Sequence, residues 1–172
     1  MLDATPAEIR PAENGDLGAI LAIHNRAIRE SLAIWSEAEV APSERRRWLD
    51  EHRMAGHPVL VAVVDGTVAG FAAYGQWRPR TGYRFCVENS VYLADEYHRR
   101  GIGRQLMLEL IRLAKANGMH VMMAGIEAGN LASIALHREL GFDEPVILRQ
   151  VGYKFDQWLD LALMRLDLTA PR

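Results

Sequence analysis

A hexapeptide with two glycines and two arginines, His98–Gly103, constrains the fold of this chain more than any other stretch. It follows a strand-like run that ends at Leu93 and precedes the helix-like segment LMLELIRLAKANG. A strand that becomes a helix at glycines leaves backbone N–H groups pointing the same way, and the helix dipole adds positive charge there. Such a turn is typical of a layered α/β protein and can bind a pyrophosphate. A tight turn with surface arginines and no ligand is the alternative.

The remaining hydrophobic pattern predicts a mixed sheet of about seven strands flanked by about four helices. Asp65-Gly66 is a hairpin turn between two strands, Asn14 is a candidate helix N-cap, and Gly118 ends a helix. The predicted strands are 8–10, 58–64, 67–74, 83–93, 119–126, 146–153 and 158–168. The predicted helices are 17–28, 42–56, 101–117 and 131–140.

Length and composition exclude several classes of protein. The 172 residues predict one domain, 1–172, and a net charge of -2 with interspersed acids and bases gives no nucleic-acid-binding stripe. Arg45–Arg47 is interpreted as a solvated helix face. The single cysteine, Cys86, excludes an intrachain disulfide and a multi-cysteine zinc site, and no histidine pair has metal-ligand spacing. Without a signal-peptide pattern or a bilayer-spanning run, we expect a soluble cytoplasmic protein with no membrane partner.

The residues after the glycine turn exclude two kinds of phosphate site. A Walker loop requires Lys-Ser/Thr after its second glycine, whereas Arg104-Gln105 follows here. A dinucleotide fingerprint requires a third glycine, and position 106 is leucine.

Two signatures together resemble the GNAT acyltransferase superfamily. The first, Arg/Gln-x-x-Gly-x-Gly/Ala, reads His98-Arg99-Arg100-Gly101-Ile102-Gly103, with His in place of Arg/Gln. The second reads Asn130-x-x-Ser133-x-x-Leu136-His137-x-x-x-Gly141-Phe142. The resemblance implies the GNAT fold, acetyl-CoA as co-substrate, direct transfer in a ternary complex and no metal. The positions it assigns to acetyl-CoA are Val91, Tyr92, Leu93, His98, Arg99, Arg100, Gly101, Ile102, Gly103, Arg104, Asn130, Ser133 and His137.

Longer stretches resemble the phosphinothricin and methionine sulfoximine N-acetyltransferases. Val87-Glu88-x-x-Val91-Tyr92 matches one strand of that family, and Gly152-x-Lys154-x-x-x-Trp158-x-Asp160 matches its tail. The resemblance implies N-acetylation of the α-amine of a glutamate analogue, such as L-phosphinothricin, L-methionine sulfoximine or sulfone, or arsinothricin. It also implies a homodimer and a role in detoxification.

Glu88 is the candidate general base. In a strand, Arg84, Cys86, Glu88, Ser90 and Tyr92 share one polar face that leads into the glycine turn. The ammonium of the acceptor must lose a proton before it attacks, and burial raises the pKa of a carboxylate toward the working range. An exposed Glu88 paired with Arg84 is the alternative.

His137 is the candidate acid at the departing thiolate, at a position where many superfamily members have tyrosine. The alternative is a helix histidine that packs on the sheet and is satisfied by a backbone carbonyl. The resemblance places a backbone N–H near Tyr92 or Leu93 against the carbonyl oxygen, where two strands splay apart and the pantetheine arm fills the gap.

Planar guanidinium groups suit the carboxylate and oxo groups of a glutamate analogue. Arg78 and Arg84 are therefore the main substrate candidates, and surface arginines are the alternative. Further candidates are Tyr83, Lys154 and Trp35, a pocket wall from the same or a partner subunit. Trp158 and Asp160 are interpreted as structural residues that hold the last strand. Cys86 as an acyl-carrying nucleophile is less favoured than Cys86 as a packing residue.

Two other functions stay open. An acetyltransferase for a polyamine, an amino sugar or a peptide N-terminus would favour an acidic pocket, against which Arg78 and Arg84 argue. A catalytically silent acyl-CoA sensor would bind acetyl-CoA without turnover, whatever stands at position 88.

Overall fold

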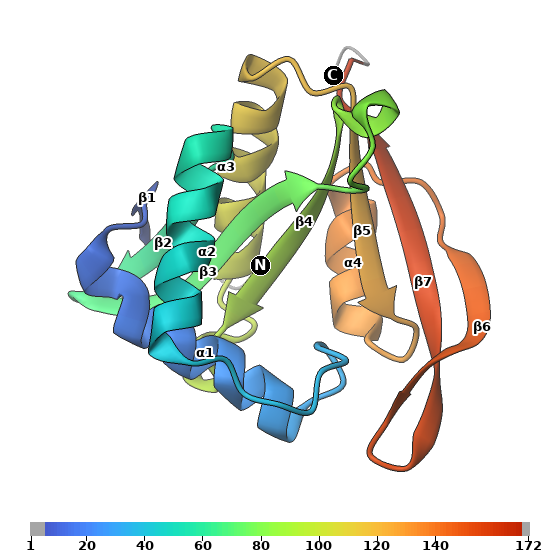
Figure 1. The fold of residues 1–172 in the computed structure, drawn as a ribbon, viewed down its shortest axis with the longest axis horizontal. Helices are drawn as coiled ribbons and strands as arrows, with labels where there is room; N and C mark the ends of the chain where they lie inside the picture. The colour runs from blue at the N-terminus through green and yellow to red at the C-terminus, as the bar shows by residue number, and fades with distance from the viewer. Residues whose placement is uncertain (1–5, 170–172) are drawn as a thin grey trace.

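The computed structural model describes residues 6–169, which form a seven-stranded mixed sheet in the order β1-β2-β3-β4-β5-β7-β6 (Figure 1). The strands are β1 (Glu8–Pro11), β2 (Val59–Val64), β3 (Thr67–Gln76), β4 (Cys86–Leu93), β5 (Val121–Glu127), β6 (Val146–Lys154) and β7 (Gln157–Asp167). The α-helices are α1 (Leu17–Glu30), α2 (Pro42–Ala55), α3 (Ile102–Ala116) and α4 (Leu131–Glu139). This confirms the predicted architecture.

The pairing of β4 with β5 decides where the sheet opens. It is the parallel pairing of the sheet, and it covers only Cys86–Glu88 against Val121–Met123. Beyond Glu88 and Met123 both strands continue without pairing to each other. The backbone on the facing edges of β4 and β5 is therefore left without a ladder partner at that point.

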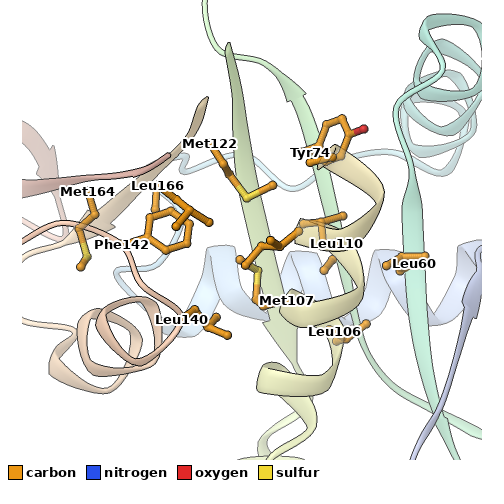
Figure 2. Packing of buried hydrophobic residues seen from close by; sticks show 14 of the residues in the cluster. Leu60, Tyr74, Leu106, Met107, Leu110, Met122, Leu140, Phe142, Met164 and Leu166 are labelled. Atoms are coloured by element: carbon orange, nitrogen blue, oxygen red, sulfur yellow. The ribbon is translucent and has the colours of Figure 1, made fainter. Parts of the chain in front are cut away.

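Each face of the sheet carries its own core. Leu106, Met107 and Leu110 of α3 pack against β-strand residues that include Met122 on one face, in a cluster that also contains Leu140 (Figure 2). A second cluster gathers apolar residues of α1, α2, β2 and β3 on the other face. Because the helical residues recur every three or four positions, each helix presents one apolar stripe to the sheet. α3 and α4 thus cover one face, and α1 and α2 cover the other.

The start of α1 differs from the prediction. Asn14 does not cap it, because Asn14–Asp16 forms a short 3-10 turn and the helix begins at Leu17. The Asp16 carboxylate accepts the Glu13 amide at 2.8 Å and pairs with the Arg10 guanidinium at 2.7 Å. The hydrogen bond from Arg10 lowers the pKa of Asp16.

The solvated face predicted for Arg45–Arg47 is wrong for Arg45, which is only 4 % exposed. Its guanidinium carbon lies 4.5 Å from the centre of the Trp48 ring, one turn further along α2. The helical repeat of three to four residues places Arg45 on the same buried side as Trp48 and Leu49.

Within residues 6–169, none of the helices combines the length and apolar character needed to cross a bilayer.

Candidate active site

The glycine turn lies between β4 and α3, as predicted. Gly101 has φ +74°, a left-handed conformation that suits glycine, and α3 begins at the next residue. The Gln105 amide donates to the Gly101 carbonyl at 3.1 Å. This is the first hydrogen bond of the helix, so the N–H groups of residues 102–104 have no carbonyl of the helix to donate to. Such free amides at the start of a helix are the kind of groups that can bind an anion.

Three side chains of the turn make contacts with neighbouring segments. The His98 ring contacts the Leu93 carbonyl with its Nε2 at 3.2 Å, which ties the turn to the end of β4. Arg104 pairs with Glu139 of α4 at 2.8 Å. The Arg100 guanidinium carbon lies 5.4 Å from the centre of the Tyr97 ring. Backbone and aromatic contacts thus fix the turn while Arg99 and Arg100 remain exposed.

A slit opens between β4 and β5 where their pairing ends. It is lined by Ala33, Asn89, Ser90, Val91, Tyr92, Ala124, Gly125, Ile126, Glu127, Asn130, Ser133 and His137. A second groove shares Ala33, Val91, Tyr92 and Asn130 with it and runs along α1 to Leu93 and His98. The adjoining grooves therefore bring together seven of the positions that the resemblance assigns to acetyl-CoA: Val91, Tyr92, Leu93, His98, Asn130, Ser133 and His137.

Glu88 is the last residue of β4 that pairs with β5, at the point where the slit begins. Its Oε1 lies 3.0 Å from the point that a Cβ on Gly125 would occupy, so the glycine of β5 makes room for the carboxylate. Burial raises the pKa of Glu88, and the positive charge of Arg78 opposes that rise. A half-buried carboxylate with a raised pKa fits a proton acceptor better than an exposed surface charge.

Arg84 does not lie on the polar face of β4, because the strand begins at Cys86 rather than at residue 83. Thr81–Tyr83 forms a 3-10 turn instead. The Arg84 Nη1 donates to the Thr81 carbonyl at 3.0 Å, and its guanidinium carbon lies 4.6 Å from the centre of the Phe85 ring. No ion pair between Glu88 and Arg84 occurs in the described part of the chain.

Arg78 and Tyr83 come together around Trp77. The Arg78 guanidinium carbon lies 4.8 Å from the centre of the Trp77 ring, and Tyr83 meets that ring edge-on at 5.3 Å. Arg78 is also the cation that acts on the Glu88 carboxylate. The loop therefore places a guanidinium near the candidate base.

His137 is 2 % exposed, and both of its ring nitrogens make hydrogen-bond contacts. Its Nδ1 lies 2.8 Å from the Ser133 carbonyl, and its Nε2 lies 3.1 Å from the Asn89 Oδ1. The Asn89 Nδ2 donates to the Met123 carbonyl at 3.0 Å, which bridges β4 and β5 at the point where they part. Burial lowers the pKa of His137. The contact with the Ser133 carbonyl fits the alternative in which His137 is a structural residue. The His137 ring nevertheless lines the slit, so a thioester bound in the slit would lie beside it.

Lys154 occupies different surroundings from the predicted ones. The Lys154 ammonium is fully buried and donates to three backbone carbonyls at 2.6 to 2.7 Å. These bonds use all of its donors, so a substrate carboxylate finds none. The Trp35 indole packs on Gly152 of β6, and Ala33 of the same loop lines the slit.

The two tail residues differ. Asp160 accepts the Gln150 amide at 2.8 Å, as a structural role predicts. Trp158 is 63 % exposed and meets the Tyr153 ring at 5.1 Å across the hairpin, so it packs on the surface and not in the core.

Burial raises the pKa of the Cys86 thiol, which disfavours the nucleophilic thiolate.

A polar cluster around Tyr92 was not predicted from the sequence. The His24 ring meets the Tyr92 ring edge-on at 5.9 Å, and Arg45 acts on both groups. Burial raises the pKa of Tyr92 to about 12 and, with Arg45, lowers that of His24 to about 4. In the described chain, His24 Nδ1 and Arg45 Nε are buried without a hydrogen-bond partner. The spacing of Arg45 and Leu49 on one helix stripe is the signal that could have revealed it.

The sequence of this region also matches a known protein family. Residues 20–142 match the model of the Acetyltransferase (GNAT) family. The chain belongs to the GNAT acetyltransferase family. It is therefore an N-acetyltransferase by descent, and acetyl-CoA is the co-substrate of that family.

Individual relatives cover nearly the whole chain. An L-methionine sulfoximine/L-methionine sulfone acetyltransferase from Pseudomonas aeruginosa is 48% identical over 96% of this chain and 97% of its own. A phosphinothricin N-acetyltransferase from Alcaligenes faecalis is 37% identical over 94% and 83%.

Two solved structures share the fold closely. A putative acetyltransferase from Salmonella typhimurium, solved with its cofactor acetyl-CoA, has a TM-score of 0.94 and 42% identity over 97% of this chain and 96% of its own. A ribosomal-protein-alanine N-acetyltransferase from Brucella melitensis has a TM-score of 0.91 and 50% identity over 93% and 99%.

Proposed function

We propose that this chain transfers an acetyl group from acetyl-CoA to the α-amine of a glutamate analogue such as L-methionine sulfoximine, L-methionine sulfone or L-phosphinothricin. The observation that carries the proposal is the position of Glu88. A half-buried carboxylate with a raised pKa stands where β4 and β5 part, on the strand that leads to the glycine turn. The names of the relatives at 48% and 37% identity support this choice of acceptor.

The residues of the turn fit a pyrophosphate. The backbone amides of residues 102–104 would bind it, and exposed Arg99 and Arg100 would add charge. Val91, Asn130 and Ser133 would line the arm that reaches into the slit. When bound there, acetyl-CoA supplies an activated thioester.

Glu88 accepts a proton from the acceptor ammonium, directly or through a water molecule. The neutral amine then forms the new C–N bond, and the C–S bond breaks. β4 amides that face the slit, at Tyr92 or Leu93, stabilise the negative charge that develops on the carbonyl oxygen. His137 would provide a hydrogen bond or a proton to the departing sulfur after its Nε2 leaves the Asn89 Oδ1.

The acceptor needs cations for its carboxylate and its second oxo group. Arg78 is the main candidate because it lies near Glu88, while Arg84 and Tyr83 lie in the same loop. Trp35 would wall the pocket from the α1–α2 side.

We also propose that the chain acts as a cytoplasmic homodimer in detoxification. The β6–β7 hairpin carries an apolar surface that one subunit leaves uncovered, and a second copy would bury it. Its exposed members are Val146, Ile147, Leu148, Val151, Tyr153, Phe155 and Trp158.

The test is CoA release from acetyl-CoA with L-methionine sulfone, L-phosphinothricin or L-glutamate as acceptor. We expect turnover of an analogue and little turnover of glutamate, with a large loss in Glu88→Gln. Acetyl-CoA binding without turnover of any acceptor would contradict the proposal and favour the silent sensor.

A peptide N-terminus is a second candidate acceptor, because the 50% identical Brucella melitensis protein is called a ribosomal-protein-alanine N-acetyltransferase. A peptide that begins with alanine, assayed in parallel, distinguishes the two acceptors.

A further inference from the structure

Lys154, the last residue of β6, is a fully buried cation whose three close partners are backbone carbonyls, and the charge of Glu37 in the loop after α1 also acts on it. Its Nζ donates to the carbonyls of Ile28 at 2.7 Å, Ser31 at 2.7 Å and Ile34 at 2.6 Å. A buried ammonium is unfavourable unless its donors are satisfied, and here three carbonyls satisfy three donors. The contact joins segments far apart in sequence, since the three bonds span 126, 123 and 120 positions.

The three carbonyls belong to the end of α1 and the loop after it. Ile28 lies in the last turn of α1, Ser31 is its C-cap, and Ile34 lies in the loop. A cation at this place satisfies carbonyls that the helix itself leaves free. Ala33 stands between the two loop acceptors and lines both the slit and the groove along α1. Lys154 thus fixes the backbone on both sides of a residue that forms a pocket wall.

Gly152 makes a second contact from β6 to the same loop. A Cβ on Gly152 would lie 2.3 Å from Cε3 and Cζ3 of the Trp35 ring, so any larger residue would displace the indole. The Trp35 Nε1 donates to the Leu32 carbonyl at 2.9 Å, which links the ring back to its own loop. Here glycine is required by close approach, since its φ lies outside the left-handed region.

We infer that Lys154 and Gly152 are positioning residues that hold residues 31–35 as the acceptor-side wall of the slit. They act through Ala33 and Trp35 and touch neither acceptor nor acetyl-CoA. Their loss therefore weakens acceptor binding more than acetyl-CoA binding: Ala33 also borders Val91, Tyr92 and Asn130, but the pyrophosphate of acetyl-CoA would be held by the turn at the start of α3, which these residues do not touch. The inference rests on the proposed function in that the acceptor binds on this side of the sheet.

The experiment compares Lys154→Met and Gly152→Ala with the wild type, and Arg149→Gln on exposed β6 is the matched control. We expect the KM for L-methionine sulfone to rise at least tenfold in both test variants. The Kd for acetyl-CoA should stay within twofold, and amides of residues 31–40 should exchange hydrogen faster. Arg149→Gln should stay within twofold of the wild type throughout. Unchanged acceptor KM and unchanged exchange in folded Lys154→Met would overturn the inference.

A double-mutant cycle covers the case in which Lys154→Met does not fold. If Gly152→Ala acts by displacing the indole, it should add nothing to the acceptor KM in a Trp35→Leu background. If the increases in acceptor KM caused by the two substitutions add, Gly152→Ala does not act by displacing the Trp35 indole, and this part of the inference is wrong. If the wild type turns over no glutamate analogue, the proposed acceptor fails, and the exchange of residues 31–40 in Lys154→Met and Gly152→Ala still decides the inference.

Discussion

The two faces of the sheet around β4 are built in different ways. On the α3–α4 face, backbone amides of the glycine turn are positioned by helix geometry, and Asn89 and His137 satisfy each other. On the α1–α2 face, Glu88 and Tyr92 are desolvated, and His24 and Arg45 each bury a nitrogen without a partner in the described chain. In the proposed function, the first face contributes the amides that would bind the pyrophosphate of acetyl-CoA. The second concentrates perturbed side chains, which is typical of the place where chemistry and acceptor choice are decided.

The largest effect should come from the reactive face. Replacing Glu88 with Gln removes the proton acceptor, and we expect kcat to fall by about 10²- to 10⁴-fold. Steady-state CoA release measures it, and calorimetry should give an unchanged acetyl-CoA Kd. A weaker affinity for acetyl-CoA with an unchanged kcat would indicate that Glu88 binds acetyl-CoA rather than accepts the proton.

The pH profile sharpens the same point. The raised pKa of Glu88 means that kcat/KM should fall as the pH drops through that pKa, because the base becomes protonated.

The next effect should come from the α3–α4 face. Gly101→Val places a β-branched residue at φ +74°, and we expect the acetyl-CoA KM to rise by roughly 10- to 100-fold. Gly56→Val is the control, since Gly56 has φ +69° after α2 and lines neither groove. It should lower the melting temperature but keep the KM. Equal KM changes in the two variants would indicate general destabilisation.

Arg78→Gln should raise the acceptor KM by roughly tenfold, because a guanidinium contact to a carboxylate is lost. It should also move the acidic limb of the pH profile upward, since Arg78 opposes the rise in the pKa of Glu88. Arg80→Gln in the same exposed loop should do neither. If the acceptor KM changes but the acidic limb of the pH profile does not shift, Arg78 binds the acceptor without acting on Glu88.

The smallest effect concerns stability. The pKa of His24 is lowered from 6.5 to about 4, so unfolding takes up protons between these values and stability falls as the pH drops. We expect His24→Phe to remove ~1 kcal/mol of the loss between pH 7 and pH 4, allowing for partial solvent access. Urea unfolding at both pH values measures it, with exposed His120→Phe as the control. Parallel losses in all three proteins would contradict the role of His24.

The two faces also differ in how far the sequence predicts them. The end of β4, the glycine turn and the start of α4 each carry a contiguous motif, so seven of the positions that line the slit and the groove along α1 could be predicted from the sequence alone. Lys154 could not be placed, because its three carbonyl partners lie 120 to 126 positions away in the sequence. The predicted place of Arg84 on β4 is wrong, because a 3-10 turn at Thr81–Tyr83 makes the strand begin at Cys86 rather than at residue 83.

The most direct measurement is a competition. L-methionine sulfone, L-phosphinothricin, L-glutamate, spermidine and an alanine-starting peptide are mixed at equal concentration with labelled acetyl-CoA, and mass spectrometry identifies the labelled products. The ratio of products gives the ratio of kcat/KM values. We predict label on the α-amine of the two glutamate analogues and little elsewhere. Label mainly on the peptide or on spermidine would contradict the account of the acceptor face.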